Sequence, residues 1–186
     1  MALRMPAPDQ DVLARRREIV ASLREIVPGE GVIDAEDELR AYECDALSVY
    51  RQLPMVAVLP STTDQVSRIL RYCHENRVRV VPRGAGTSLS GGALPLADGV
   101  LLGLGKFNKI LDIDYANRTV TAQPGVTNLG ISTAVASSGF YYAPDPSSQI
   151  ACTIGGNIAE NSGGVHSLKY GLPTNNVLGI EMGLGT

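Results

Sequence analysis

Hydrophobic residues near the N-terminus follow a helical repeat. Apolar side chains recur at three- and four-residue intervals over residues 9–27, and the repeat ends before Pro28-Gly29. This spacing predicts one amphipathic helix over 9–27 that packs against the rest of the protein. Residues 33–53 are mixed and acidic, so we interpret 1–53 as a helical lead-in. Its expected anchors onto the next domain are the large side chains of Tyr42, Leu47 and Tyr50.

From residue 54 onward the pattern changes to short apolar runs. Met55–Leu59 predicts a buried strand, Ser61-Thr62-Thr63-Asp64 a capping box that opens a helix, and Val78–Val81 the next strand. A strand, a helix and a second strand within about thirty residues are typical of a right-handed βαβ unit. Ligands of open α/β sheets bind at the carboxyl ends of strands. A glycine-rich segment follows Val81 at that end.

The remaining elements predict an α+β fold over a domain at 54–186. They are a strand over Gly99–Leu104, a hairpin over 110–122 that adds a mixed sheet, a helix from a Thr127 cap to Ser137 with Gly139 as its stop, a short helix over Thr153–Asn161, and a last strand over Val177–Leu184. Because the last strand would end without a partner, we expect the domain to be truncated at its C-terminus.

Composition narrows the classes of function. The chain has 186 residues, 44% of them hydrophobic, with a net charge of −3, as is typical of a soluble globular protein. Its basic residues are scattered, so nucleic acid is not an expected partner. No apolar run reaches the roughly 20 residues that span a bilayer. The three cysteines contain no Cys-x-x-Cys pair. We therefore expect a cytoplasmic protein without a transmembrane segment or a metal site.

The strongest chemical signal is the segment Pro82-Arg83-Gly84-Ala85-Gly86-Thr87-Ser88-Leu89-Ser90-Gly91-Gly92. Its glycines permit positive φ angles and close approach to a ligand. Consecutive N–H groups and three hydroxyls supply donors that phosphate oxygens need. Alone, such a segment also fits a plain turn or linker. A second glycine-rich cluster, Thr153 to Gly164, favours one extended ligand.

Five motifs in order resemble those of FAD-linked oxidases of the vanillyl-alcohol oxidase/p-cresol methylhydroxylase (PCMH) type. They are Arg83 to Gly92, Gln123-Pro124-Gly125, Pro144-Asp145-Pro146, Ile154-Gly155-Gly156-Asn157 with Asn161 and Gly163-Gly164, and Lys169-Tyr170-Gly171. Within this superfamily the chain is most similar to the flavin subunits of bacterial glycolate oxidases, with D-lactate and D-2-hydroxyglutarate dehydrogenases as near relatives. The resemblance, which begins near Pro54, implies a PCMH-type FAD-binding domain of two α/β subdomains.

The resemblance also assigns residues to the cofactor. The first glycine loop would hold the FAD pyrophosphate, and the second cluster would run beneath the isoalloxazine ring and ribityl chain. The residues expected at FAD are Arg83, Gly84, Ala85, Gly86, Thr87, Ser88, Gly91, Gly92, Pro124, Gly125, Pro144, Asp145, Ser148, Thr153, Gly155, Gly156, Asn157, Asn161, Gly163, Gly164 and Ile180. The plain alternatives are a surface role for Arg83 and, for the second cluster, a glycine-rich helix start packed against a strand.

Three further residues bear on the chemistry. Some family members attach FAD to a histidine of the first loop, and the absence of histidine from Arg83 to Gly92 predicts non-covalent FAD. Cys152 is expected to be a small buried residue rather than a flavin link. His166 falls near the expected flavin, but a lone histidine is more often a structural donor. The catalytic base stays unassigned.

The expected function is FAD-dependent oxidation of a small 2-hydroxy acid, glycolate or D-lactate, to the 2-oxo acid. The resemblance implies iron–sulfur and second flavin-binding subunits as partners, through which the protein could lie at the inner membrane. A P-loop NTPase is excluded because Gly105-Lys106 precedes Phe107, and a nicotinamide fingerprint is disfavoured because the loop lacks its third glycine. A flavin-binding assembly subunit, or an inactive truncated remnant, stays open as an alternative.

Overall fold

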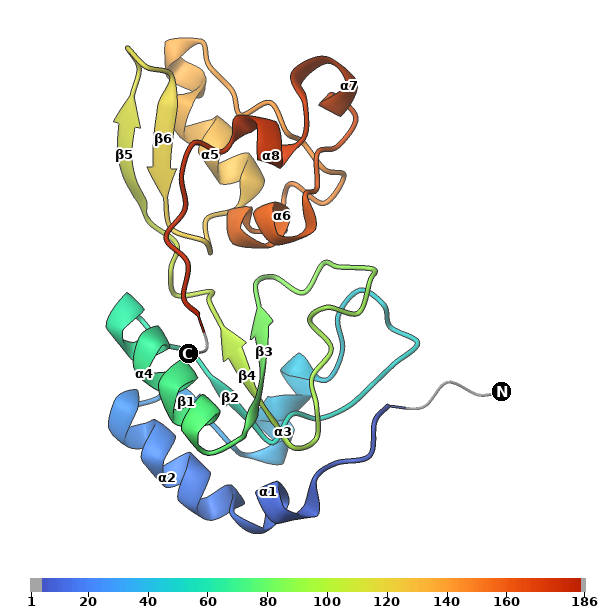
Figure 1. Cartoon of the computed structure of the whole chain (residues 1–186). Helices are drawn as coiled ribbons and strands as arrows, with labels where there is room; N and C mark the ends of the chain where they lie inside the picture. The colour runs from blue at the N-terminus through green and yellow to red at the C-terminus, as the bar shows by residue number, and fades with distance from the viewer. Residues whose placement is uncertain (1–4, 185–186) are drawn as a thin grey trace. The chain divides into compact units, whose positions relative to one another are not determined.

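The computed structural model describes residues 5–184, which belong to two compact units (Figure 1). Of the described residues, the first unit comprises 5–104 with 182–184, and the second comprises Gly105–Glu181. Each unit contains helices, strands and an apolar cluster of its own. This division agrees with the expected mixed fold of two α/β subdomains.

The first unit contains a sheet with helices packed on it. Its elements are α1 (Gln10–Ala14), α2 (Arg16–Ile26), β1 (Val32–Ile33), α3 (Glu36–Leu39), the 3₁₀ turn η1 (Arg40–Tyr42), β2 (Val56–Val58), α4 (Thr63–Glu75), β3 (Arg79–Arg83) and β4 (Gly99–Gly103). The single helix expected over 9–27 is wrong in one respect. The chain leaves helical geometry at Arg15, where φ is −91° and ψ is 7°, so α1 and α2 are separate helices.

The four strands of this sheet lie in the order β1-β2-β4-β3. β2, β4 and β3 are parallel, and β1 is antiparallel to β2. The predicted unit β2-α4-β3 therefore has parallel strands, but they are not neighbours, because β4 lies between them. Every residue of β4 is buried, whereas β3 carries the partly exposed Arg79 and Arg83. A fully apolar strand suits the centre of a sheet, and a charged strand suits its edge.

Helices α2 and α4 contribute apolar stripes to the core of the first unit. That core joins buried residues of both helices to β2 and β4, among them Ile19, Leu23, Ile69, Val56 and Val100. A helix of the expected lead-in therefore shares its core with the sheet. The domain boundary at residue 54 stays a prediction.

The start of α4 is capped one residue later than expected. The hydroxyl of Thr62, rather than Ser61, accepts a hydrogen bond from the Gln65 amide at 3.2 Å. The side-chain oxygen of Gln65 in turn accepts from the Ser61 amide at 2.8 Å. The reciprocal pattern resembles a capping box, with Gln65 in the place expected for Asp64.

The second unit combines a hairpin with short helices. Its elements are β5 (Ile110–Asp114), β6 (Thr119–Ala122), α5 (Asn128–Val135), the 3₁₀ turn η2 (Ala136–Ser138), α6 (Ile154–Glu160), α7 (Ser167–Tyr170) and α8 (Pro173–Asn176). The expected helix limits are confirmed, since Thr127 caps α5 and Gly139 ends η2 with a φ of 76°. The expected mixed sheet is wrong, because β5 and β6 form an antiparallel sheet by themselves.

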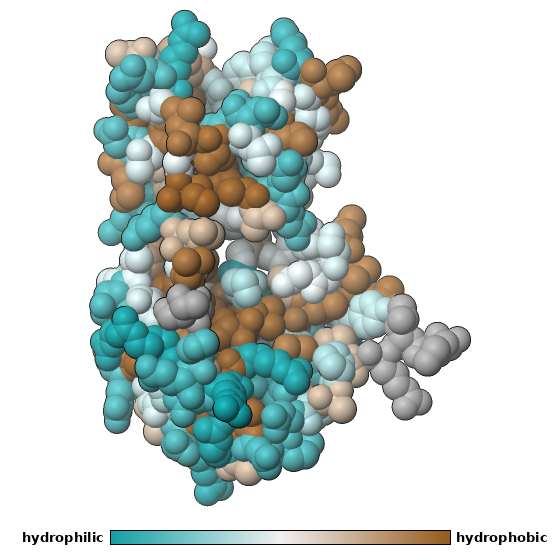
Figure 2. Space-filling model, in the orientation of Figure 1, coloured by the Kyte–Doolittle hydropathy of each residue, from teal (hydrophilic) through white to brown (hydrophobic). Residues whose placement is uncertain are grey.

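The last strand expected over Val177–Leu184 is also wrong. This segment has no regular structure, and Leu178 and Ile180 are largely exposed. On the face of the second unit that Figure 2 shows, hydrophobic residues are gathered in the upper half of the view. A strand requires a neighbour that exchanges backbone hydrogen bonds. Within residues 5–184 no strand pairs with this segment, so its apolar sequence is not enough to make one.

Candidate cofactor site

The first glycine loop, residues 84–92, follows β3 at the edge of the first sheet. The loop leaves the carboxyl end of a parallel strand, as the sequence predicts. Gly86 and Gly91 adopt φ angles of 73° and 78°, a region that residues with a side chain rarely occupy. These two glycines let the loop turn where a residue with a side chain would be strained.

The backbone donors of this loop are free. Among the described residues, no acceptor takes a hydrogen bond from the amides of Ala85 to Leu89. The Ser90 amide donates to the Ser88 hydroxyl oxygen at 3.0 Å, which stabilises the turn. No acidic residue occurs between Arg83 and Asp98. A row of free N–H groups in a segment that contains no acidic residue is suited to an anion such as phosphate.

Arg83, the last residue of β3, contacts protein groups. Its Nη1 donates to the carbonyl oxygen of Cys44 at 2.8 Å and to that of Ala93 at 3.4 Å. Its guanidinium carbon lies 5.9 Å from the centre of the Tyr42 ring. The expected contact with FAD stays a prediction for this residue.

Most glycines of the second cluster, residues 153–164, are required by packing within the second unit. A Cβ atom on Gly155 would lie 2.6 Å from Pro124 Cβ, and the Gly155 amide donates to the Pro124 carbonyl at 2.9 Å. Gly164 has a φ of 80°, and a Cβ there would overlap the carbonyl group of Asp145. The plain alternative for this cluster is a helix start packed against a strand; the glycines are indeed packed, but their neighbours Pro124 and Asp145 lie outside the strands.

Gly156 is the exception in this cluster. It is exposed on α6, and a Cβ atom added to it would meet only the Thr153 hydroxyl oxygen, at 3.5 Å. Glycine inside a helix costs about 1 kcal/mol relative to alanine. Since packing within the chain does not require glycine here, the space over Gly156 is where this cluster can admit a ligand.

A buried pair of asparagines, which the sequence analysis missed in part, holds the second cluster together. Asn128 is fully buried, and its Nδ2 donates to the Pro144 carbonyl at 2.8 Å and to Asn157 Oδ1 at 3.0 Å. Asn157 was expected to face the flavin edge, yet its side-chain oxygen is turned to Asn128. In the described part of the chain, Asn128 Oδ1 and the Thr153 hydroxyl are buried without a partner.

Asn128 could have been recognised from its position. It stands three and seven residues before Ile131 and Val135, on the buried stripe of α5. A polar residue on an apolar stripe is rarely left without a hydrogen bond. This spacing is the signal that the sequence analysis overlooked.

Asp145 and His166 form a hydrogen-bonded pair. His166 Nδ1 lies 2.6 Å from Asp145 Oδ2, and the His166 amide donates to Asp145 Oδ1 at 3.3 Å. Burial raises the pKa of Asp145, but the hydrogen bonds and the charge of His166 outweigh it, so that this pKa lies below its ordinary value. The carboxylate fixes the orientation of a histidine whose ring is largely exposed.

Two tyrosines and a lysine lie next to this pair. The rings of Tyr141 and Tyr170 meet edge to face at 6.1 Å, and Lys169 Nζ lies 4.9 Å from the centre of the Tyr170 ring. The neighbouring Tyr170 hydroxyl raises the pKa of Tyr141. Tyr141 and the adjacent Lys169 lower the pKa of Tyr170.

Three other predicted site residues occupy distinct places in the second unit. The carbonyl oxygen of Ser148 accepts hydrogen bonds from the amides of Ala151 and Cys152, and these bonds close a turn. Asn161 ends α6 with a φ of 54°, and its side chain accepts from an amide of α8. Ile180 is exposed and contributes to a hollow of about 300 Å³.

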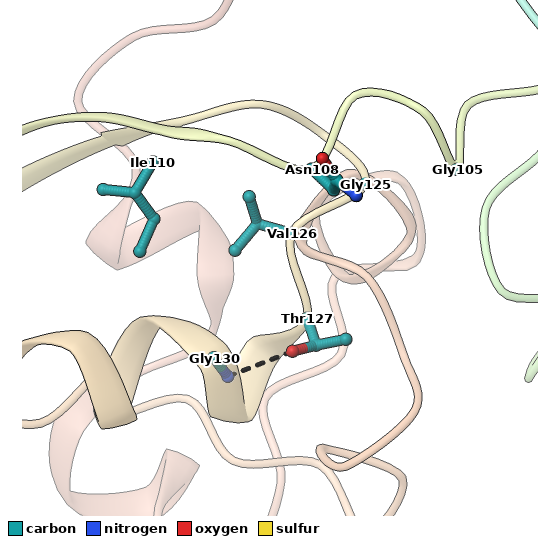
Figure 3. Close-up of a pocket in the computed structure, with 7 residues that line it drawn as sticks. All are labelled: Gly105, Asn108, Ile110, Gly125, Val126, Thr127 and Gly130. Atoms are coloured by element: carbon teal, nitrogen blue, oxygen red, sulfur yellow. Dashed lines mark hydrogen bonds between the residues drawn. The ribbon is translucent and has the colours of Figure 1, made fainter.

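A shallow hollow of about 490 Å³ lies where the Pro124-Gly125 turn meets α5 (Figure 3). Its lining residues are Gly105, Asn108, Ile110, Gly125, Val126, Thr127 and Gly130. Gly125 thus borders an open surface, while its amide donates to the Phe107 carbonyl at 2.7 Å. The Thr127 hydroxyl is occupied as the cap of α5, accepting from the Gly130 amide at 3.1 Å.

The described residues show neither of two other features. No helix within residues 5–184 is long and apolar enough to cross a membrane. Over the same range, no group of three or more histidine, cysteine, aspartate or glutamate residues could hold a metal ion.

Comparison with known families identifies one match, described as an FAD binding domain, over residues 54–186. The glycolate oxidase subunit GlcD of Escherichia coli (strain K12) is 57% identical over 175 residues, which cover 94% of this chain and 34% of that protein. GlcD of Bacillus subtilis (strain 168) is 44% identical, and the match covers 89% of this chain and 35% of that protein. A probable mitochondrial D-2-hydroxyglutarate dehydrogenase of Oryza sativa subsp. indica is 35% identical, and the match covers 88% of this chain and 29% of that protein. The chain spans about a third of the length of these relatives.

Solved structures show the same fold. An alkyldihydroxyacetonephosphate synthase superimposes with a TM-score of 0.75 at 22% identity, covering 92% of this chain and 33% of that one. p-Cresol methylhydroxylase with substrate bound superimposes with a TM-score of 0.65 at 25% identity, covering 84% and 31%. In both comparisons the matched region is about a third of the solved chain.

Proposed function

Because the chain belongs to the FAD-binding domain family of the vanillyl-alcohol oxidase/PCMH type, we propose that it is the flavin-binding part of a 2-hydroxy-acid oxidoreductase. The substrate would be a small acid, glycolate or D-lactate, converted to the 2-oxo acid. The observation that carries this proposal is the 57% identity to a glycolate oxidase subunit over 94% of the chain. Similarity to a D-2-hydroxyglutarate dehydrogenase supports the same class of substrate.

The residues present fit an FAD. The free amides of Ala85 to Leu89 are suited to the pyrophosphate, because hydrogen bonds to charged groups contribute roughly 1.5–3 kcal/mol each. In the second unit, the open face at Gly156 exposes helix backbone that a planar ligand can approach. We infer that the first loop binds the phosphates and that the second cluster contacts the flavin.

The chain's own contribution would be binding and orientation. A bound flavin supplies the acceptor for the two electrons that leave the substrate. We propose that it is held without a covalent bond, since the first loop contains no histidine. The groups that bind the substrate carboxylate and take its hydroxyl proton are proposed to lie in sequence that this chain does not cover.

Partner subunits follow from the names of the relatives, which are called subunits of glycolate oxidase. We propose an iron–sulfur subunit as electron acceptor and a second flavin-binding subunit. Through them the protein would lie at the inner membrane while itself remaining on the cytoplasmic side.

The test begins with the cofactor of the complete natural protein. After acid precipitation, we expect FAD in the supernatant. Yellow colour that stays in the washed pellet would contradict non-covalent binding, and absence of flavin from both fractions would contradict the cofactor itself.

Activity is then measured as glycolate- and D-lactate-dependent dye reduction with added FAD. The complete protein should reduce the dye, whereas residues 1–186 alone should not. Turnover by the short chain would refute the proposed division of roles. Flavin binding without turnover of either acid by the complete protein would favour the assembly-subunit alternative.

A further inference from the structure

We propose that Arg83 is a positioning residue that couples the first glycine loop to residues 42–47, so that the lead-in takes part in holding the flavin. Residues 42–47 are called the brace below. The family match begins at residue 54, so the brace lies outside it. The identity of the ligand rests on the proposed function, while the coupling rests on the contacts of Arg83.

Arg83 links the brace to both ends of the loop. It is the last residue of β3, and one guanidinium nitrogen donates to Cys44 in the brace and to Ala93 just beyond the loop. The Tyr42 ring lies beside the same guanidinium, 5.9 Å from its carbon to the ring centre. The side chain therefore connects the two ends of the loop with the brace, which lies about 40 residues earlier in the sequence.

Gly86 is packed directly on this guanidinium. A Cβ atom at Gly86 would lie 2.6 Å from Arg83 Cζ, so any larger residue would displace the arginine. The Gly86 carbonyl accepts from the Ala46 amide of the brace at 2.9 Å. The arginine is thus packed against the stretch whose amides are free to bind an anion.

The brace has a fixed shape of its own. Asp45 is only 5% exposed, and its Oδ1 accepts from the Leu47 amide at 2.8 Å, which forms a turn. Leu47 in turn lies 3.5 Å from the Cβ position of Gly91. The brace therefore meets the loop at Gly86 and Gly91, the two glycines with positive φ.

Arginine suits this role better than lysine. Its planar guanidinium can donate in several directions and stack on an aromatic ring, whereas an ammonium group is a compact point charge. A side chain that binds phosphate as a cation would tolerate lysine. A side chain that joins two carbonyls and a tyrosine would not.

The experiment measures FAD affinity of the complete protein at low and high salt. The variants are Arg83→Lys, Arg83→Met, Tyr42→Leu and the double variant of Tyr42→Leu with Arg83→Met. Arg71→Met, which changes an exposed arginine of α4, is the matched control. Unfolding midpoints are recorded on the same samples.

We expect Arg83→Lys and Arg83→Met to weaken FAD binding by similar factors, on the order of tenfold or more. The salt dependence of Arg83→Lys should stay as in the wild type, because lysine keeps the positive charge beside the loop. Tyr42→Leu should weaken binding less, and its effect should nearly vanish in the double variant, because both residues act through one contact. The Arg71 control should bind normally.

Other results would overturn the proposal. Normal affinity of Arg83→Lys, with lost affinity and weaker salt dependence of Arg83→Met, would show a direct phosphate contact. Normal affinity of Arg83→Met would show no role in binding. If Arg83→Met fails to fold, Arg83→Lys and Tyr42→Leu decide the matter. A wild type without FAD refutes the proposed function, whereas a wild type with FAD and insensitive variants refutes only the positioning role.

Discussion

The two glycine-rich clusters have similar composition and opposite internal organisation. In the first loop the amides of Ala85 to Leu89 have no acceptor among the described residues, and the glycines serve to bend the backbone. In the second cluster Gly155 and Gly164 serve to make room for Pro124 and Asp145. The first cluster leaves its donors for a ligand, and the second mostly satisfies itself.

This difference shows that a glycine-rich sequence can have either of two structural roles. Glycine can free backbone donors for an external partner, or it can allow two segments of the same chain to touch. Gly156 differs from the other glycines of the second cluster, because the space above it is open and a ligand could approach its backbone. The first three predictions below test this division with matched pairs of glycines.

The largest effect is expected at Gly164. Gly164→Ala should lower the free energy of unfolding by about 3 kcal/mol, because the new Cβ adds overlap with Asp145 to an unfavourable φ. Gly139→Ala is the control, since Gly139 has a φ of 76° but open space, and it should cost about 1 kcal/mol. Urea unfolding followed by tyrosine fluorescence measures both. Equal losses would mean that the overlap is relieved by movement.

At Gly86 the expected effect is on ligand binding. Gly86→Ala should reduce FAD affinity about a hundredfold, because it strains the loop and displaces the Arg83 guanidinium. Gly29→Ala is the control, with a φ of 81° and no neighbour within reach. It should lose a little stability and no affinity. Flavin titration of both variants is the measurement, and unchanged binding by Gly86→Ala would reduce the loop to a plain turn.

Gly156 should show opposite effects on stability and binding. Gly156→Ala should stabilise the flavin-free protein by about 0.5–1 kcal/mol through helix propensity, while lowering FAD affinity about tenfold. Gly155→Ala, at the neighbouring packed position, should destabilise the protein instead. Thermal unfolding without FAD and flavin titration separate these outcomes. Normal affinity of Gly156→Ala would assign the whole second cluster to packing.

The smallest effect concerns acid stability. His166 lowers the pKa of Asp145 in the folded protein, so the pair contributes stability above the ordinary value of 3.8 and loses it as pH falls through the lowered pKa. The wild type should therefore be more stable to unfolding than Asp145→Asn near neutral pH, and this difference in stability should disappear in acid. Unfolding midpoints across this range test it. A difference that does not change with pH would exclude the ionised pair.

Much of the local structure could be predicted from the sequence. The Thr127 cap, the Gly139 stop and the short helix before Asn161 occur as expected, because caps and glycine stops depend on residues within one turn. The first glycine loop was likewise recognised from its own residues. For the same reason the family resemblance, which rests on contiguous motifs, agrees with the matched domain at 54–186.

Contacts between distant residues were decided only by the tertiary structure. The insertion of β4 between β2 and β3, the absence of a strand at Val177–Leu184 and the direction of Arg83 each depend on partners far along the chain. A hydrophobic run indicates that a segment prefers burial. A strand also requires a free edge of another strand with which to pair. A glycine indicates that the backbone can approach a neighbouring group closely. Only the tertiary packing decides whether that neighbour is a ligand or another part of the protein.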